Sequence, residues 1–352
     1  MRFFITGGAG FIGSELVRHL INTTSFKVFN ADALSYAGNL DSLKSIENSE
    51  RYKFLNLNIC DYELLLDAIN NFRPDFILHL AAESHVDRSI ENPEHFFTTN
   101  VFGTLNMLKA SREYWDALEG NKRQSFRFHH ISTDEVYGDL GRGSTKKFDE
   151  LSAYDPSSPY SASKASSDHL VRAWGRTYGL PIVISNCSNN YGPYQFPEKL
   201  IPNVIINAIN NKPINIYGDG MQVRDWLYVS DHVEALLQIV LNSEPGKTYN
   251  IGGNNEVTNI EIVNKICSLL DEEYPLDSDN SYKNLINFVE DRPGHDQRYA
   301  INSEKILKDI GWYPKENFDT GLKKTVRWYL ANSSWVERIL SGEYKLNRIG
   351  LL

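Results

Sequence analysis

TGGAGFIG, residues 6–13, sets the architecture that the rest of the chain follows. The stretch contains both the GxGxxG and the GxxGxxG spacing, and it comes directly after a short apolar run at residues 3–5. Apolar residues then recur at helical spacing, at Phe11, Ile12, Leu16 and Leu20. A strand, a glycine turn and a helix in this order predict a dinucleotide site, because the glycines let a pyrophosphate approach the backbone at the helix N-terminus.

Asp32 extends this prediction to the choice of dinucleotide. It lies 32 − 13 = 19 residues after Gly13, at the end of the second predicted strand. A carboxylate in that place accepts hydrogen bonds from a ribose diol and repels a 2′-phosphate. The neighbouring Ala33 and Leu34 supply no cation, so the sequence favours NAD over NADP.

Short β-rich runs alternate with helical ones over the first two-thirds of the chain, which predicts an α/β fold with a doubly wound parallel Rossmann sheet. The expected strands are residues 3–5, 27–30, 53–57, 75–80, 126–132 and 182–185, and the expected long helices are 94–115 and 161–178. More Pro, Asn and Gly after about Tyr191 indicate a smaller C-terminal lobe. We assign 1–190 to the dinucleotide-binding domain, 222–251 to a return into it, 191–221 and 252–352 to the lobe, and 271–283 to a polar loop.

The composition argues against several classes of function. The 352 residues carry a formal net charge of −9, and their cations are scattered, unlike the basic face of a nucleic-acid binder. Cys60, Cys187 and Cys267 are far apart and show no CxxC spacing, which favours free thiols in a reducing cytosol and argues against a metal site. We find no signal peptide and no apolar run of membrane-spanning length, so we expect a soluble cytoplasmic protein with no membrane partner.

Two further motifs carry chemistry. Tyr160 and Lys164 in YSASK lie four residues apart, on one face of a helix, where an ammonium group stabilises a phenolate and lowers the pKa of the tyrosine. Such a pair can move a hydroxyl proton while a hydride leaves the same carbon. Thr133, Asp134 and Glu135 in STDE follow the fifth predicted strand, at the sheet edge where active-site groups gather. The two acids can serve as an acid and a base, and a solvated loop is the alternative.

Several longer stretches resemble the dTDP-glucose 4,6-dehydratases of the extended short-chain dehydrogenase/reductase family. They are TGGAGFIG, DALSYAGNL, HLAAESHVDRS, STDEVYG, YSASKA, SNCSNNYGPYQFPEKLIP, RDWLYVSDH and DRPGHDQRY. STDEVYG is the discriminating stretch, because related sugar-nucleotide epimerases and decarboxylases lack the Asp-Glu pair there. The resemblance implies an NAD-dependent lyase that dehydrates dTDP-glucose to dTDP-4-keto-6-deoxyglucose, a step in deoxysugar biosynthesis of the dTDP-rhamnose type, with NAD regenerated in each cycle.

The same resemblance implies roles for individual residues. Tyr160, assisted by Lys164 and Thr133, would take the C4 hydroxyl proton, Glu135 would take the C5 proton, and Asp134 would protonate the departing C6 hydroxyl. The residues that would bind NAD are Gly7, Gly10, Phe11, Ile12, Gly13, Asp32, Ser35, Asn58, Ile59, Leu80, Ala81, Ala82, Ser84, Thr99, Tyr160, Lys164 and Asn190. Those that would bind the sugar, the diphosphate or the base are Ser84, Thr133, Asn189, Lys199, Leu200, Asn215, Tyr217, Arg224, Asn259, Arg292 and His295.

The chain departs from the family pattern in the part that would bind the adenosine. Ala33 and Ser35 stand where Lys and Thr are frequent, and Asn58 stands where Asp is frequent. The amide oxygen of Asn58 can still accept a hydrogen bond from the adenine amino group, so we expect weaker but intact binding.

Assembly and alternatives complete the expectations. The family implies a homodimer joined through residues 94–115 and 161–178. A UDP-sugar 4-epimerase, a decarboxylase, a GDP-mannose or UDP-sugar dehydratase and a catalytically silent NAD-binding sensor are the alternative functions. An ion pair with Asp291 is the alternative role of Arg292.

Overall fold

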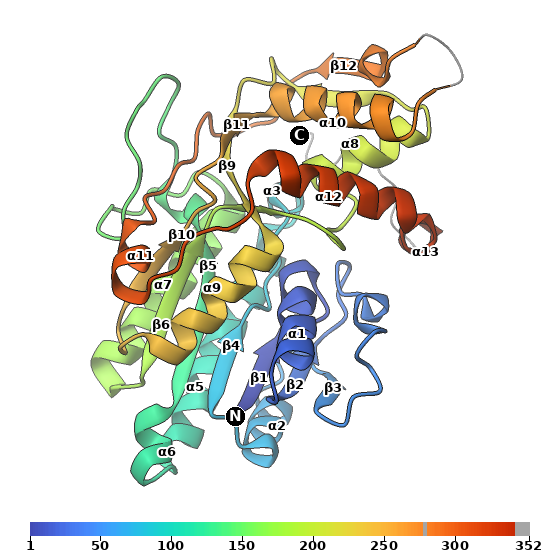
Figure 1. Ribbon diagram of the computed structural model, residues 1–352. Helices are drawn as coiled ribbons and strands as arrows, with labels where there is room; N and C mark the ends of the chain where they lie inside the picture. Colours follow the sequence, from blue (N-terminus) through green and yellow to red (C-terminus); the bar gives the residue numbers. More distant parts are fainter. Residues whose placement is uncertain (277–279, 342–352) are drawn as a thin grey trace.

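One seven-stranded parallel sheet forms the centre of the molecule in this computed structural model, which describes residues 1–276 and 280–341 (Figure 1). Its strands are β1 (Arg2–Thr6), β2 (Lys27–Asp32), β3 (Tyr52–Asn56), β4 (Phe76–His79), β5 (Arg127–Thr133), β6 (Ile182–Cys187) and β10 (Thr248–Ile251). They lie in the order β3-β2-β1-β4-β5-β6-β10, so the winding reverses between β1 and β4. Ligands of such sheets bind at the carboxyl edge of this reversal. The predicted doubly wound Rossmann fold is confirmed.

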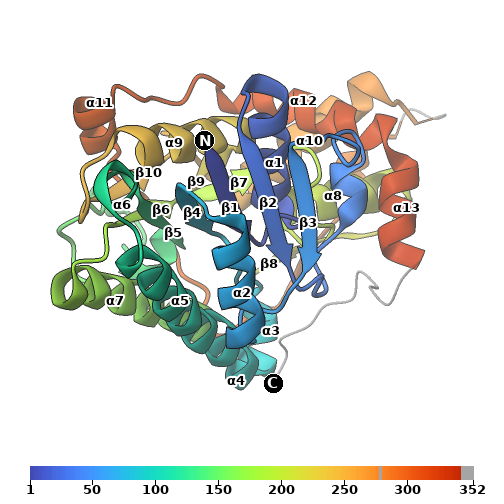
Figure 2. The same ribbon diagram turned by 90° about the horizontal axis from the view of Figure 1, so that it is seen from below.

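Helices cover both faces of the sheet (Figure 2). One face carries α1 (Phe11–Thr23), α9 (Val229–Asn242) and α11 (Glu304–Ile310), and the other carries α2 (Tyr62–Phe72), α5 (Thr104–Asp116) and α7 (Pro159–Tyr178). Each face has its own buried apolar cluster, one around Leu16 and Val233 and one around Leu65 and Leu108. Strands with apolar helices on both sides are buried throughout, as β4 shows. A short helix α6 (Gly120–Ser125) leads into β5.

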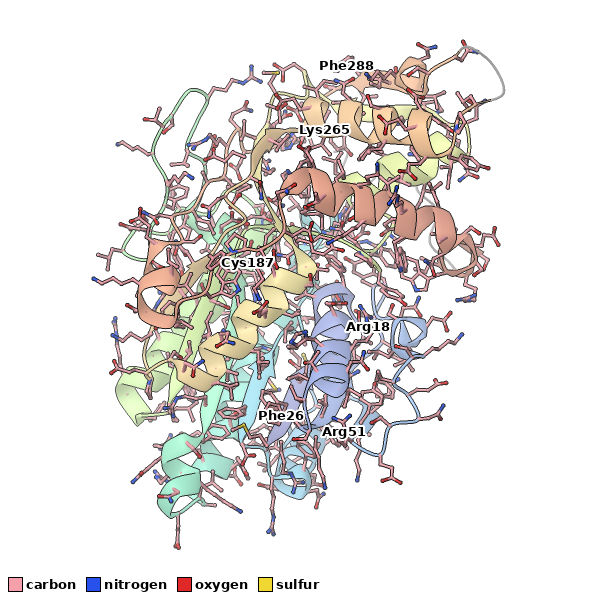
Figure 3. All side chains as sticks on the ribbon, in the orientation of Figure 1. Arg18, Phe26, Arg51, Cys187, Lys265 and Phe288 are labelled. Atoms are coloured by element: carbon pink, nitrogen blue, oxygen red, sulfur yellow. The ribbon has the colours of Figure 1, made fainter. Side chains whose placement is uncertain are left out.

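A second lobe lies beyond the carboxyl edge of the sheet, and it is smaller and largely helical (Figure 1). Its helices are α8 (Leu200–Ile209), α10 (Asn259–Glu273), α12 (Phe318–Ala331) and α13 (Ser333–Ser341). Two small sheets accompany the seven-stranded one: β7 (Asn189–Tyr191), β9 (Val223–Tyr228) and β11 (Glu256–Thr258) form one, and β8 (Ile214–Tyr217) and β12 (Ile286–Val289) form the other. Figure 3 shows Phe288 at the outer surface of this lobe and Cys187 in the interior. The lobe has a core of its own around Ile205 and Ile266.

Two predicted elements differ from the structure. Instead of one helix over 94–115, there are α4 (Pro93–Phe96), a π-helical segment η2 (Phe97–Gly103) and α5. The side chain of Asn100 explains the interruption, because it bonds the backbone of Glu83 and the hydroxyl of Ser163.

The predicted polar loop at 271–283 is wrong at both ends. Its first residues belong to α10, and η4 (Tyr282–Leu285) begins with a buried tyrosine whose backbone N–H bonds the Asp271 carboxylate. Residues 277–279 of that loop, and 342–352 of the predicted lobe, lie outside the described range. Within 1–276 and 280–341, no helix combines the length and apolar character needed to cross a membrane.

Candidate active site

The glycine turn between β1 and α1 has no room for larger residues. Gly7 has a φ of +73°, and a Cβ on it would lie 2.7 Å from the backbone nitrogen of Ala81. A Cβ on Gly13 would lie 2.1 Å from the carbonyl oxygen of Gly7. Gly10 precedes α1 and provides no side-chain cap, so the first N–H groups of the helix can bind an anion.

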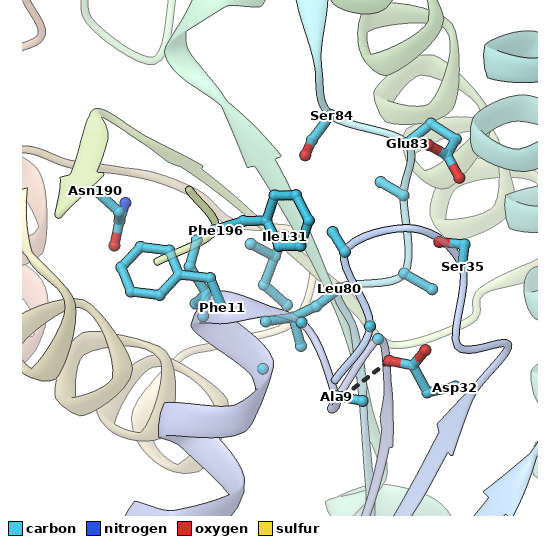
Figure 4. Close-up of a pocket in the computed structure, with 18 of the residues that line it drawn as sticks. Ala9, Phe11, Asp32, Ser35, Leu80, Glu83, Ser84, Ile131, Asn190 and Phe196 are labelled. Carbon is cyan, nitrogen blue, oxygen red and sulfur yellow. Dashed lines mark hydrogen bonds between the residues drawn. The ribbon is translucent and has the colours of Figure 1, made fainter. Parts of the chain in front are cut away.

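Asp32 ends β2 beside this turn. One carboxylate oxygen accepts a hydrogen bond from the backbone of Ala9 (Figure 4), and the other accepts one from the backbone of Leu34, both at 2.8 Å. Burial raises the pKa of Asp32, and these two hydrogen bonds oppose part of that rise. Each oxygen keeps a second lone pair, which a ribose hydroxyl can use.

A cavity of about 340 Å³ opens at the carboxyl edge of the sheet, where the winding reverses. Figure 4 shows Phe11, Leu80, Ile131 and Phe196 around it. Every residue that the sequence predicted to bind NAD lines this cavity: Gly7, Gly10, Phe11, Ile12, Gly13, Asp32, Ser35, Asn58, Ile59, Leu80, Ala81, Ala82, Ser84, Thr99, Tyr160, Lys164 and Asn190. The segments after β1, β2, β3, β4 and β6, together with η2 (Phe97–Gly103) and α7, therefore bring these distant residues together.

The five predicted catalytic residues also line the cavity. Thr133 ends β5, and Asp134 and Glu135 open the 3-10 helix η3 (Asp134–Tyr137) that follows directly. Tyr160 and Lys164 lie in the first two turns of α7, whose start is fixed by a capping box from Ser158 and by Pro159. The solvated-loop alternative does not hold for Asp134, which is buried, and Glu135 beside it in η3 is half-buried.

Tyr160 does not have the lowered pKa that the sequence analysis expects. Burial raises the pKa of its phenol well above the ordinary value, and the Glu135 carboxyl raises it further, whereas a hydrogen bond with Thr133 lowers it. The Lys164 ammonium donates to the carbonyl of Ile131 at 2.9 Å, and burial lowers its own pKa. Desolvation of the phenolate therefore outweighs the stabilisation by the Thr133 hydrogen bond.

The two acids have different surroundings. Burial raises the pKa of Asp134 well above its ordinary value, and Glu135 and Asp225 raise it further. Burial also raises the pKa of Glu135, but Lys199, Arg224 and Arg292 oppose that rise. Asp134 is thus held in the protonated form, while cations favour the Glu135 carboxylate. This is the difference that a proton donor and a proton acceptor require.

The predicted substrate residues fall into two groups. Ser84, Thr133, Asn189 and Lys199 line the cavity, and the Lys199 ammonium donates to the carbonyl of Ser84 at 3.0 Å. The other predicted residues do not line it: Leu200, Asn215, Tyr217, Arg224, Asn259, Arg292 and His295.

Within the second group, Tyr217, Arg292 and His295 lie together. The guanidinium of Arg292 donates to Asp87 at 2.7 Å, and the Tyr217 hydroxyl is 3.5 Å from the same carboxylate. The ring of His295 packs edge-on against that of Tyr217. The alternative pairing of Arg292 with the Asp291 side chain is not seen, because the Asp291 carboxylate binds His295 and the backbone of Arg292 instead.

Of the remaining predicted substrate residues, one bonds the backbone and the others lie in the second lobe. Arg224 is buried and donates to the carbonyl of Asp296 at 2.9 Å. Asn215 accepts from Asn287 across the β8–β12 pair. Asn259 and Leu200 begin α10 and α8.

Sequence reasoning missed several residues of the cavity wall. The Tyr36 hydroxyl donates to the buried Glu198 carboxylate at 3.0 Å, and the Arg88 guanidinium lies over the Tyr36 ring. Glu83 and, from α13, Trp335 also line the cavity. Tyr36, Glu83, Arg88 and Glu198 all lie within stretches that resemble the family, so their position was a signal, but their contacts depend on distant segments.

Comparisons with known proteins agree with this geometry. A family model described as GDP-mannose 4,6 dehydratase matches residues 4–325. A dTDP-glucose 4,6-dehydratase of Neisseria meningitidis serogroup B is 56% identical over 351 residues, which cover 99% of each chain.

Two solved structures have the same architecture. A dTDP-glucose 4,6-dehydratase of Bacillus anthracis, in complex with NAD, superposes with a TM-score of 0.85 at 42% identity and covers 96% of this chain and 99% of its own. DesIV of Streptomyces venezuelae, a dTDP-glucose 4,6-dehydratase with NAD and TYD bound, gives a TM-score of 0.86 at 39% identity, with 96% and 100% covered. The chain belongs to the family of the 4,6-dehydratases, and within it to the dTDP-glucose 4,6-dehydratases.

Proposed function

We propose that this protein dehydrates dTDP-glucose to dTDP-4-keto-6-deoxyglucose, with NAD held in the cavity at the carboxyl edge of the sheet. The names of its relatives support the substrate and the reaction, and the NAD in both solved relatives supports the cofactor. The product would enter deoxysugar biosynthesis.

The residues of the cavity fit NAD. The turn from Gly7 to Gly13 leaves space for a pyrophosphate, and the N-terminus of α1 offers it N–H groups. Asp32 has free lone pairs for the ribose hydroxyls, and neither Ala33 nor Leu34 would pair with a 2′-phosphate. When bound, NAD would supply the reversible hydride acceptor that this reaction needs, and its oxidised ring would add a positive charge to the site.

The side chains of the chain then share the proton transfers. Tyr160, hydrogen-bonded to Thr133 and one helical turn before Lys164 on α7, takes the proton of the C4 hydroxyl. Oxidation at C4 makes the C5 hydrogen acidic, and Glu135 removes it. Asp134, held protonated by burial, gives its proton to the departing C6 hydroxyl.

The cations around Glu135 are proposed to hold the nucleoside diphosphate. Lys199 lines the cavity, and Arg224 and Arg292 are close enough to act on the Glu135 carboxyl. Arginine suits phosphate because it donates two parallel hydrogen bonds. Arg292 donates to Asp87 in the structure, so a bound diphosphate would share or replace that partner.

The presence of Asp134 and Glu135 in one cavity with Tyr160 and Lys164 carries this proposal. A simple dehydrogenase or a 4-epimerase needs only the Tyr–Lys pair, whereas elimination of water needs a further base and acid. The purified protein, without added cofactor, should convert dTDP-glucose to a product lighter by one water, as seen by mass spectrometry. UDP-glucose and GDP-mannose should react more slowly. A product of unchanged mass from dTDP-glucose would indicate epimerisation and overturn the proposal.

The domain boundaries, the cellular location and the oligomeric state of the protein are also proposed. We propose that 1–190 with 222–251 form the NAD-binding unit and 191–221 with 252–352 the substrate lobe, which the pairing of β10 with β6 and the separate core of the lobe support. We propose a cytoplasmic location. We propose a homodimer joined through 94–115 and α7, and the exposed rings of Phe97 and Phe102 on η2 support it.

A further inference from the structure

A carboxylate lies buried behind the catalytic wall without lining the cavity. Asp168 is four residues after Lys164 and eight after Tyr160 on α7, so it continues the same helix face inward. Its side chain has no exposed surface, and neither has that of His130 beside it. A buried carboxylate is costly unless it is paired and hydrogen-bonded, so its partners indicate its role.

Asp168 gathers partners from three other parts of the chain. One oxygen accepts hydrogen bonds from the Tyr154 hydroxyl at 2.7 Å and from the Asn186 amide at 3.2 Å. Its other oxygen is 3.2 Å from Nε2 of His130. The Tyr154 hydroxyl in turn accepts from the Arg172 guanidinium at 2.7 Å. The loop before α7, strand β6 and strand β5 therefore all converge on this one side chain.

Asn186 links Asp168 to the strand end that carries the catalytic acids. The same Asn186 amide nitrogen donates to the carbonyl of Thr133 at 3.1 Å. The side chain of Thr133 lines the cavity, and Asp134 and Glu135 follow it directly. A shift of the Asp168 carboxylate would thus reach the catalytic strand end through a single side chain.

The negative charge of Asp168 also connects it to Lys164. Burial lowers the pKa of Lys164, and the Asp168 carboxylate is the first of the groups that raise it. Burial would raise the pKa of Asp168 itself, but contacts with His130, Lys164 and Tyr154 outweigh it and keep the group ionised.

The other groups that face Asp168 do not replace this charge. Arg172 is a second cation on α7, and burial lowers the pKa of His130 to about 4, which leaves that ring neutral. Burial also raises the pKa of Tyr154 and Tyr137, so both phenols stay protonated. Asp168 is therefore the carboxylate that balances the Lys164 ammonium.

We propose that Asp168 is a positioning residue for the first oxidation: it keeps Lys164 charged and, through Asn186, holds the end of β5 in place. The inference rests on the proposed function, because it assigns Asp168 a part in the first step of that reaction. Asp168 acts through Lys164 and Thr133 and touches neither substrate nor cofactor.

The test is the pH profile of C4 oxidation in a single turnover. Protein loaded with NAD is mixed with dTDP-glucose, and NADH absorbance is followed between neutral and alkaline pH. Asp168→Asn removes the charge that raises the Lys164 pKa, so that pKa falls and the alkaline limb moves to lower pH. We expect a shift of about one unit or more, the usual effect of a close opposite charge. Sugar-nucleotide affinity should change less than about twofold, since Asp168 does not line the cavity.

Two matched variants separate charge from packing. Asp168→Glu disturbs the packing but keeps the charge, and it should retain the alkaline limb of the parent. Asp231→Asn removes another buried carboxylate, which accepts from the backbone of Lys315 and Glu316 away from the cavity, and it should leave the profile unchanged.

The outcomes are distinct. A slower Asp168→Asn with an unmoved alkaline limb would overturn the proposal and leave Asp168 a purely structural residue. If Asp168→Asn does not fold, Asp168→Glu decides: a retained limb supports the proposal, and a limb displaced by a full unit contradicts it. Failure of the parent protein to form NADH from dTDP-glucose would instead reject the proposed function.

Discussion

Asp134 and Glu135 are neighbours in sequence, yet one is held protonated and the other faces three cations. Glu135→Gln should still oxidise C4 and accumulate NADH, but it should barely exchange the C5 hydrogen in deuterated water. Asp134→Asn should also accumulate NADH and retain C5 exchange, because only departure of the C6 hydroxyl is impeded. Turnover should fall about a hundred- to ten-thousand-fold in each variant.

Stopped-flow absorbance measures the accumulation of NADH, and mass spectrometry of recovered substrate measures the exchange of the C5 hydrogen. Thr133→Ser is the matched control, since it keeps the hydroxyl beside Tyr160 and should retain most of the activity. C5 exchange in Glu135→Gln but not in Asp134→Asn would show that the two roles are reversed. Turnover at the parent's rate in either variant would remove that residue from the mechanism.

Residues whose position depends on local spacing could be predicted from the sequence. Gly7, Gly13 and Asp32 are tied to one strand–turn–helix–strand unit, and Tyr160 and Lys164 to one turn of helix. The pKa of Tyr160 could not be predicted, because burial by the surrounding chain decides it. Asp168 and Glu198 were missed for the same reason, since their partners come from segments far away in sequence.

Strand β5 carries two adjacent histidines that the fold buries without charge. His129 bonds the hydroxyl of Ser185 on β6 at 2.9 Å, and burial lowers its pKa to about 3. In the unfolded chain the ordinary pKa is near 6.5. Below about pH 6.5 the unfolded chain therefore binds a proton that the folded chain does not, and stability falls as the pH falls.

We expect substitution of His129 to reduce the pH dependence of the free energy of unfolding. Relative to the parent, His129→Gln should become less destabilised by about 1.4 kcal/mol for each unit that the pH falls below about 6.5. Urea unfolding near pH 7.5 and pH 5.5 measures the difference. Ser185→Ala is the control, because it removes the same hydrogen bond and no titratable group, so its effect should not vary with pH. A pH-independent effect of His129→Gln would contradict the assignment of a neutral buried ring.

Elements were predicted well where apolar periodicity continued without tertiary interference. Strands β1 to β6 lie where the short β-rich runs placed them, and their ends differ by a few residues. The helix over 94–115 was predicted as continuous, yet η2 interrupts it. The cause is the pairing of Asn100 with Glu83 and Ser163, which no local pattern contains.

At the scale of the whole molecule, the site belongs to neither lobe alone. The sheet and α7 supply the glycine turn, the acids and the Tyr–Lys pair, while Lys199 comes from the segment 191–221 of the second lobe. The higher content of Pro, Asn and Gly after about Tyr191 indicated a second lobe, but the sequence did not predict how closely the two lobes approach each other. That distance depends on contacts such as Arg292 with Asp87, which join residues 205 positions apart.

The surface beside η2 indicates where two copies of the protein would meet in the proposed homodimer. Phe97 and Phe102 on this segment are 38% and 61% exposed, and the segment itself packs against α5 and α7. Large exposed rings on adjoining helices are typical of a protein interface. The proposed homodimer would cover them. Phe102→Glu would place a charge in that apolar interface, where desolvation without a partner is costly.

Sedimentation velocity at micromolar concentration should therefore give twice the chain mass for the parent and the mass of one chain for Phe102→Glu. Leu151→Glu is the matched control, because Leu151 is 93% exposed in a turn outside the proposed interface, and it should leave the dimer intact. A dimeric Phe102→Glu would place the interface elsewhere, and a monomeric parent would exclude the dimer. Since Phe102 does not line the cavity, a folded monomeric variant that still binds NAD would also show that each subunit carries a complete cofactor site.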